Sequence, residues 1–351
     1  MTSTRNAGGS GIRSRRILVA AAAALVAVVG VSALSGFHRQ LREIDPPGAD
    51  AASELTTPAI VGIRTFTPPE GIVVDEDVEY GVRDDGTVLT LDVCRPAVIP
   101  AEAAPAAAAA LTTAGTTALP AVVSIHGGSW ARGDKANSDW RNVCLWLASE
   151  GFVAASVNYR LVPEVRFPAA IDDVSLAVQW LRDPEQLERF DVDPARIGAF
   201  GGSAGGNLAA LLGTTGDGPL DVGSRVAAVA ELSGPVGLTA DELVADGASA
   251  WLRGIVAAYL GCEADAGDDA CPQATDASAA SFIDASDPPF FIGHAETEVV
   301  PLAQSRGFAA SLADAGVPVE LAAVAGSEHS IGILDEAMRA RVAAFLHASL
   351  G

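Results

Sequence analysis

The stretch Ala199-Phe200-Gly201-Gly202-Ser203-Ala204-Gly205-Gly206-Asn207-Leu208 places one serine between an apolar run and an Ala/Leu-rich run. The first run predicts a strand and the second a helix. A sharp strand-to-helix turn strains the backbone of the serine, exposes its hydroxyl and points N–H groups at a developing oxyanion. Because glycine-rich chains contain G-x-S-x-G by chance, Ser203 becomes a candidate nucleophile only together with partners elsewhere.

A second glycine turn follows another apolar run. Residues 122–125 predict a buried strand, and His126-Gly127-Gly128-Ser129-Trp130 follows directly. The backbone N–H groups of Gly127 and Gly128, together with that of Ala204 after the serine, are predicted to form an oxyanion hole. We expect His126 to brace this turn by hydrogen bonding rather than to titrate in catalysis.

The C-terminal third of the chain supplies a base and an acidic loop. Residues 319–324 predict a strand, and His329 lies on the loop just beyond it, which makes it the candidate base. Between serine and histidine, residues 289–301 read as a strand followed by a loop with Glu296 and Glu298. The chain order serine, acid, histidine is that of the α/β-hydrolase triad.

Strands and helices alternate through most of the chain. This rhythm predicts an α/β fold with a mostly parallel central sheet and helices on both faces. At the carboxyl ends of such strands, where ligands bind, Gly127, Ser203, the acidic loop and His329 are expected to meet. The expected strands are residues 73–80 and 88–94, forming a hairpin, then 121–125, 152–157, 197–200, 227–232, 289–292 and 319–324, with helices near 140–149, 168–181, 204–213, 303–315 and 332–350.

Three segments interrupt this rhythm. Residues 38–70 are rich in Pro, Ala, Thr and Asp and predict a flexible tether, which leaves residues 71–351 as the catalytic domain. Residues 97–120 are mostly Ala, Thr and Pro and predict a low-complexity loop. Residues 238–284 follow a strand and are expected to overhang the sheet edge as a small helical cap, with plain surface decoration as the alternative.

The N-terminus carries a targeting signal. Residues 1–16 hold four arginines and no acidic residue, and an almost unbroken apolar run follows over residues 17–34. Residues 1–37 are therefore predicted to be a signal peptide or an N-terminal membrane anchor. Val31-Ser32-Ala33 resembles a cleavage site, whereas the length of the run suits a spanning helix. Both readings predict an extracytoplasmic protein, either secreted or held to the membrane by one helix.

The charge of the chain narrows the kinds of molecule that it can bind. All 44 acidic residues but only 18 of the 22 basic ones follow residue 37, so that part has a formal charge of about −26. This charge disfavours nucleic acid as a partner.

Cys262 and Cys271 bracket a short loop and are expected to pair, which leaves Cys94 with Cys144. No C-x-x-C or H-E-x-x-H pattern indicates a metal site.

Taken together, these motifs resemble the α/β-hydrolase fold and, within it, the carboxylesterases of the hormone-sensitive-lipase-like, or BD-type, esterase group. The resemblance covers roughly residues 72–350. It implies a serine esterase that acts on short- to medium-chain acyl esters of small molecules and needs no cofactor. The matching residues are His126-Gly127-Gly128-Ser129-Trp130, Gly133-Asp134-Lys135, Val157-Asn158-Tyr159-Arg160-Leu161, Phe167-Pro168-Ala169-Ala170, Gly201 to Gly206, Pro288-Pro289, Val300-Pro301, Gln304-Ser305, Gly326 and His329.

One departure from the family pattern concerns the acid. Members usually place an aspartate four residues before the proline matched by Pro301, and Thr297 occupies that position here. A threonine cannot offset the charge of an imidazolium, whereas its two glutamate neighbours can. Because glutamate serves in some triads, we predict Glu298 as the acid, with Glu296 as the alternative.

The sequence leaves two other functions open. A related amide, formamide or peptide hydrolase uses the same machinery. A binding module on the cell surface, disarmed by the loss of its acid at Thr297, would have the same fold without catalysis.

Overall fold

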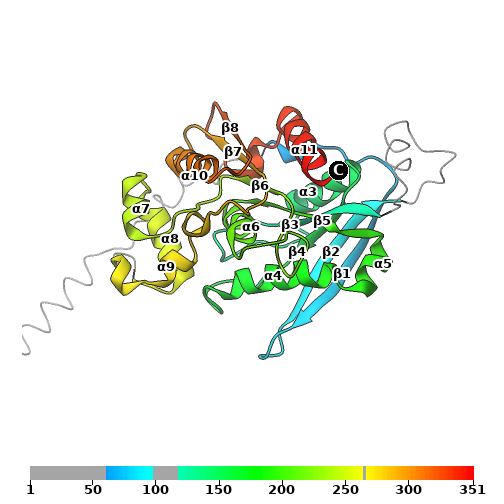
Figure 1. Cartoon of the computed structure of the whole chain (residues 1–351), viewed down its shortest axis with the longest axis horizontal. Coiled ribbons are helices and arrows are strands. Elements are labelled where there is room, and N and C mark those ends of the chain that lie inside the picture. Colours follow the sequence, from blue (N-terminus) through cyan, green and yellow to red (C-terminus); the bar gives the residue numbers. More distant parts are fainter. Residues whose placement is uncertain (1–60, 98–117, 264–265) are drawn as a thin grey trace, which may run out of the picture. The chain divides into compact units, whose positions relative to one another are not determined.

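An eight-stranded sheet forms the centre of the computed structural model, which describes residues 61–97, 118–263 and 266–351 (Figure 1). Its strand order is β1-β2-β4-β3-β5-β6-β7-β8. β2 pairs antiparallel with β1 and β4, and all other neighbours are parallel, which confirms the predicted sheet. The strands are β1 (Ile72–Val82), β2 (Val88–Pro96), β3 (Leu119–Ile125), β4 (Val153–Val157), β5 (Val192–Gly202), β6 (Val229–Leu232), β7 (Phe290–Ala295) and β8 (Val319–Val324).

Burial along the strands follows their position in the sheet. The central strands β4, β6 and β7 are buried along their whole length, in line with sequences that are apolar except for one polar residue in each. The edge strand β1 is largely exposed, and register shifts after Asp75 and Glu79 interrupt its pairing with β2. Such irregularities keep an edge strand from pairing with another chain.

Helices cover both faces of the sheet (Figure 1). One face packs against α4 (Ala169–Leu181), α5 (Pro184–Phe190), α6 (Ala204–Thr214) and α10 (Leu302–Asp314). The other packs against α3 (Ser138–Ser149) and α11 (Glu336–Leu350), together with the short 3-10 helices η1 (Ile63–Thr65) and η5 (Ser330–Ile333). Side-chain caps set where α3 and α11 begin, since Asn137 and Asp335 accept hydrogen bonds from free N–H groups of the first turns.

The segment of residues 238–284, called the cap below, lies between β6 and β7. It contains α7 (Ala240–Ala245), α8 (Ala250–Leu260), η3 (Asp268–Ala270), α9 (Gln273–Asp276) and η4 (Ala279–Phe282). Figure 1 shows α7, α8 and α9 together on one side of the sheet. Thr239 and Glu242 form a capping box at the start of α7, and Gly261 ends α8 in the left-handed conformation.

Two disulfides join distant parts of this unit, in the pairing predicted from the sequence. Cys94 of β2 bonds to Cys144 of α3, and Cys262 bonds to Cys271 within the cap. The first bond spans 50 residues of chain and ties β2 to α3, the helix that covers this face of the sheet.

The predicted tether, residues 38–70, ends earlier than expected. From residue 61 the chain packs against the domain: Ile63 is fully buried, and Arg64 pairs with Asp139 at 2.7 Å. The N–H group of Gly62 also donates to the carbonyl of Gly332 at 3.0 Å. The apolar residues here, Ile60, Val61, Ile63 and Phe66, form a run too short and too irregular to reveal this docking.

Several sequence predictions fall on residues outside the described part. They are the N-terminal segment 1–37, residues 38–60 of the tether and nearly all of the loop 97–120. At the end of that loop, β3 begins at Leu119, two residues before the strand predicted there. Over the described residues, no helix has both the length and the hydropathy needed to span a membrane.

Candidate active site

Ser203 lies at the turn between β5, which ends at Gly202, and α6, which begins at Ala204. Its backbone has φ 57° and ψ −124°, a conformation that is strained for any residue with a side chain. The turn has no room for larger neighbours, because a Cβ at Gly205 would lie 2.6 Å from the carbonyl oxygen of His126. The sharp turn predicted from the glycines is present, and it leaves the Ser203 side chain partly exposed.

The glycine turn after β3 packs directly against this elbow. A Cβ at Gly127 would lie 2.6 Å from the carbonyl oxygen of Gly202 and 3.2 Å from Cβ of Ser203. Gly128 has φ 131°, which a residue with a side chain rarely adopts. Within the described residues the N–H groups of Gly127 and Gly128 donate to no protein acceptor. These donors and that of Ala204 are thus available beside the serine.

His126 braces the glycine turn. Its Nδ1 lies 3.0 Å from the carbonyl oxygen of Gly127, and its ring stacks on Tyr159 with 4.3 Å between centroids. The Tyr159 hydroxyl donates to the carbonyl of His126 at 2.8 Å. Burial lowers the pKa of His126 to about 4, so the ring is neutral near pH 7. This geometry agrees with the supporting role expected from the sequence.

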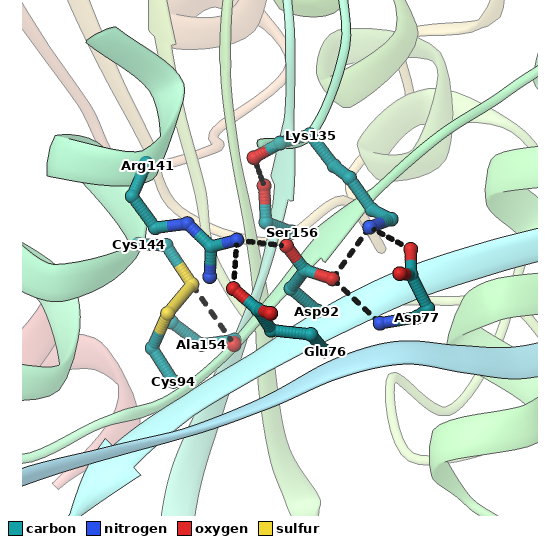
Figure 2. Close-up of a disulfide and its surroundings, with 9 residues drawn as sticks. All are labelled: Glu76, Asp77, Asp92, Cys94, Lys135, Arg141, Cys144, Ala154 and Ser156. Atoms are coloured by element: carbon teal, nitrogen blue, oxygen red, sulfur yellow. Dashed lines mark hydrogen bonds and ion pairs between the residues drawn. A yellow bond between two sulfur atoms is a disulfide. The ribbon is translucent and has the colours of Figure 1, made fainter. Parts of the chain in front are cut away.

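The segment that follows this turn joins a cluster of charges around the buried side chains of Asp92 and Lys135, shown in Figure 2. The fully buried carboxylate of Asp92 lies 2.5 Å from Nζ of Lys135 and 2.8 Å from a guanidinium nitrogen of Arg141. Asp77 also pairs with Lys135, at 2.7 Å, and the Ser156 hydroxyl donates to the Lys135 carbonyl. Lys135 follows the glycine turn by only a few residues, so the cluster and the nearby Cys94–Cys144 bond fix the segment that leaves the turn.

His329 lies on the loop after β8, with 18 % of its side chain exposed. The next residue, Ser330, packs against Gly202, because a Cβ at Gly202 would collide with the Ser330 hydroxyl. The neighbours of the candidate base and of the candidate nucleophile are therefore in contact. Nδ1 of His329 lies 2.5 Å from Oε2 of Glu298, which leaves Nε2 available for a second partner.

Of the two candidate acids, Glu298 is the one that contacts His329. Its side chain is fully buried, and the Val300 N–H group donates to Oε2 at 3.1 Å. Burial by itself raises its pKa, but His294 and His329 beside it outweigh this and lower the pKa to about 2. The carboxylate is therefore ionised throughout the neutral range.

The other two residues of this loop point elsewhere. Glu296 is exposed, and its N–H group donates to the carbonyl of Val324. The Thr297 hydroxyl donates to the carbonyl of Gly326 at 2.8 Å. The Thr297 side chain thus ties two loops together.

The structure adds two buried polar residues that the sequence analysis did not place in the site. His294, near the end of β7, has Nε2 2.6 Å from Oε1 of Glu298. Glu231 of β6 is fully buried, and Oε2 accepts the N–H of Gly234 at 2.7 Å. In the sequence, each of these residues stands out as a polar residue in an otherwise apolar strand. This pattern does not reveal which residues it contacts.

The cap contacts both glycine turns. The ring of Tyr259 in α8 stacks on Trp130 with 4.1 Å between centroids and 3° between planes. Nδ2 of Asn207, in the first turn of α6, donates to the carbonyls of Pro235, just before the cap, and of Ala277 within it. The insertion therefore packs on residues next to the oxyanion turn and the elbow, rather than being a remote surface decoration.

Within the described residues, no group of three or more His, Cys, Asp or Glu side chains has the geometry to hold a metal ion. The chemistry available at this edge of the sheet is that of a serine, an imidazole, a carboxylate and backbone N–H donors.

A family model described as BD-FAE matches residues 110–312, more than half of the chain. The chain belongs to the BD-FAE family. The chain has an α/β-hydrolase fold, in agreement with the resemblance to hormone-sensitive-lipase-like esterases.

Curated relatives of this BD-FAE member are named as hydrolases of esters and of an amide. Neutral cholesterol ester hydrolase 1 of Rattus norvegicus is 48% identical over 93 residues, which cover 26% of this chain and 23% of that protein. Arylacetamide deacetylase of Bos taurus is 46% identical over 89 residues, covering 25% and 22%. Esterase LipQ of Mycobacterium tuberculosis is 30% identical over 234 residues, covering 64% and 53%. The chain thus spans less than a quarter of the length of the first two relatives.

Solved structures agree on the fold. A truncated carbohydrate esterase from gut microbiota aligns with a TM-score of 0.61 at 23% identity, covering 81% of this chain and 99% of that one. Esterase 2 of Thermogutta terrifontis aligns with a TM-score of 0.60 at 25% identity, covering 81% and 95%.

Proposed function

We propose that this protein is a serine carboxylesterase that hydrolyses short- to medium-chain acyl esters through an acyl-enzyme. The observation that carries the proposal is the buried Glu298 carboxylate 2.5 Å from Nδ1 of His329, on a loop whose next residue packs against the nucleophile elbow. This arrangement supplies the acid that the sequence pattern lacks at Thr297.

In the proposed reaction, Nε2 of His329 takes the Ser203 proton as Ser203 Oγ attacks the ester carbonyl. Glu298 holds the imidazole in the tautomer with a proton on Nδ1 and stabilises the imidazolium that forms. The imidazolium then gives its proton to the departing alcohol. Water, activated by the same histidine, hydrolyses the acyl-enzyme and restores the serine.

The N–H groups of Gly127, Gly128 and Ala204 stabilise the tetrahedral intermediate in this scheme. Each donor to an oxyanion contributes about 3 kcal/mol to lowering the barrier. Such donors act without rearrangement only when they are held rigidly. The positive φ of Gly128, the braced His126 and the Lys135 cluster supply that rigidity.

The test compares wild type with Ser203→Ala in the hydrolysis of a chromogenic butyrate ester and in labelling by a fluorophosphonate. The expected result is that the variant loses both turnover and label. Turnover retained by the variant, or a wild type that neither turns over nor reacts, contradicts the proposal.

Two alternatives are separated by the same assay. Arylacetamide deacetylase among the relatives keeps an amide hydrolase open, and faster turnover of an arylamide than of the matched aryl ester identifies one. A disarmed binding module, expected if the acid were missing, does not react with the fluorophosphonate. Rates across acyl chains from acetate to palmitate define the chain-length range.

We further propose that the catalytic unit works outside the cytoplasm. The basic and apolar residues 1–37 and the two disulfides support this location, because disulfides persist in oxidising compartments. Fractionation of cells producing the full chain tests it, and recovery of all the enzyme in the cytoplasm contradicts it.

A further inference from the structure

The Glu298 carboxylate lies between two imidazoles, only one of which belongs to the proposed triad. Oε2 faces Nδ1 of His329 at 2.5 Å, and Oε1 faces Nε2 of His294 at 2.6 Å. The side chains of Glu298 and His294 are both fully buried. A buried ring held this close to the catalytic acid needs an explanation that the reaction scheme does not give.

His294 is itself fixed from two further elements. Its Nδ1 lies 2.7 Å from the hydroxyl of Ser305 in α10, and Nε2 donates to the carbonyl of Val300 at 2.9 Å. Because a carbonyl oxygen only accepts, Nε2 must carry a proton. That Nε2–H group is directed at Val300 and makes no hydrogen bond to Oε1 of Glu298, so the contact with Glu298 is electrostatic.

The charges around His294 reinforce this contact. Burial alone lowers the pKa of His294, but the carboxylates of Glu298 and of Glu231 on the adjacent strand outweigh it and raise the pKa. In turn, His294 and His329 are the two neighbours that lower the pKa of Glu298. The ring therefore supplies positive potential to the side of the carboxylate that His329 does not reach.

A glutamate needs such a support more than an aspartate does. Its additional methylene adds one rotatable bond, so its carboxylate has more orientations to lose. Misplacement of a catalytic group by 1 Å can cost about 10²-fold in rate. Within the described residues, His294 is the side chain that contacts Oε1, the oxygen turned away from the base.

We infer that His294 is a positioning residue for the catalytic acid: its ring, held by the Ser305 hydroxyl and the Val300 carbonyl, places Nε2 against Oε1 of Glu298 and sets the orientation in which Oε2 meets His329. This role rests on the proposed esterase function. Contacts then link four residues, Ser203, His329, Glu298 and His294. The first three form the proposed triad, and His294 supports its acid.

A matched pair of variants separates positioning from mere packing. In His294→Gln, the amide nitrogen reaches about as far as Nε2 and keeps an N–H group next to Val300 and Glu298, but the atom facing Ser305 is lost. In His294→Asn, the shorter amide keeps a polar atom near Ser305 and loses the N–H group next to Glu298. The two variants therefore divide the contacts of the ring between them.

The expected result is a fall in kcat of about 10²-fold in H294N with KM unchanged, and a kcat at least about tenfold higher in H294Q than in H294N. In proton NMR, we expect the strongly deshielded Nδ1 proton of His329 to persist in H294Q and to weaken or vanish in H294N. Wild-type kcat in H294N, or equal losses in the two variants, overturns the inference.

If neither variant folds, the nitrogen NMR chemical shifts of His294 in the wild-type protein test the inference instead. A protonated Nε2 across the active pH range supports the inference, and an unprotonated Nε2 overturns it. These spectra remain informative in a wild type that shows no esterase activity, so failure of the proposed function and failure of this inference are distinguishable.

Discussion

Glu298 reaches His329 from one residue later in the chain than the family pattern implies for the acid. The backbone of this loop turns the Thr297 hydroxyl to Gly326 and the Glu298 side chain inward, while Glu296 points to solvent. The longer side chain of glutamate compensates for the shifted position. A comparison of the two glutamates therefore tests the site at the level of single atoms.

In Glu298→Gln, the acid is replaced by an amide of the same shape, which cannot stabilise an imidazolium. We expect kcat for butyrate ester hydrolysis to fall by up to about 10⁴-fold, as when a triad carboxylate becomes an amide. Glu296→Gln is the matched control, and its kcat should equal that of wild type because Glu296 is exposed. If Glu296→Gln instead loses activity and Glu298→Gln keeps the wild-type kcat, Glu296 is the acid.

Glu231 is a second buried carboxyl, and its ionisation opposes folding. Burial raises its pKa to about 7 from an ordinary 4.5. Between these values the folded protein binds more protons than the unfolded chain, so the stability contributed by this group is complete below about pH 4.5. It is lost as the pH rises through about 7.

The variant Glu231→Gln removes this titration while keeping an oxygen for the Gly234 N–H group. Relative to the variant, wild type should lose about 3 kcal/mol of unfolding free energy between pH 4.5 and pH 8. Urea denaturation at both pH values measures it. His126 titrates alike in both proteins and cancels in the difference, so a pH-independent offset contradicts the prediction.

Sequence reasoning reaches this site only in part, for a physical reason. Ser203, Gly127 and His329 can be inferred because each stands at the end of a recognisable apolar run, where the topology brings strand ends together. The choice between Glu296 and Glu298 depends on loop dihedrals, which no pattern encodes. The contact of His294 with Glu298 depends on which face of β7 turns toward α10.

At the scale of whole elements, the strands β3, β6 and β8 begin and end within two residues of their predicted bounds. β3 and β6 are buried almost throughout, whereas the edge strand β8 buries only Ala322. The strand predicted at residues 197–200 does not include the first residues of β5. Its first residues, Val192–Arg196, include polar and exposed positions, so only the buried part carried the signal. Helix α5 was also missed, since seven residues with two buried side chains give little periodicity.

The two disulfides allow a matched test at this scale. In the chain-entropy model, a closed loop of 50 residues stabilises by about 4 kcal/mol and one of 9 residues by about 2.5 kcal/mol. Replacing both cysteines of the Cys94–Cys144 pair by alanine should therefore reduce the unfolding free energy more than the same change in the Cys262–Cys271 pair. Urea denaturation under non-reducing conditions measures both. A larger loss from the cap pair contradicts the expectation.

For the whole molecule, the boundary between the N-terminal segment and the catalytic unit can be tested by truncation. The unit that contains the described residues begins at Pro58, whereas the sequence suggested a domain start at residue 71. A protein that starts at residue 58 should keep the wild-type kcat/KM and move to the soluble fraction, since it lacks the predicted anchor.

A protein that starts at residue 71 should also lose stability, because the buried Ile63 and the Arg64–Asp139 pair are removed. Loss of the isoleucine alone corresponds to about 2 kcal/mol. Thermal unfolding of the two truncated proteins measures the difference. Equal stability contradicts the docking of residues 61–70, and lost activity in the longer protein contradicts the boundary.

The anchorage of the cap has a consequence for how this protein can change. Asn207 donates to the carbonyls of Pro235, just before the cap, and of Ala277 within it, and Gln304 binds the backbone of Val236 and Gly237. Because all these partners are main-chain groups, the hydrogen bonds do not depend on which side chains the cap carries. Substitutions along the cap should therefore leave its attachment to α6 and α10 in place.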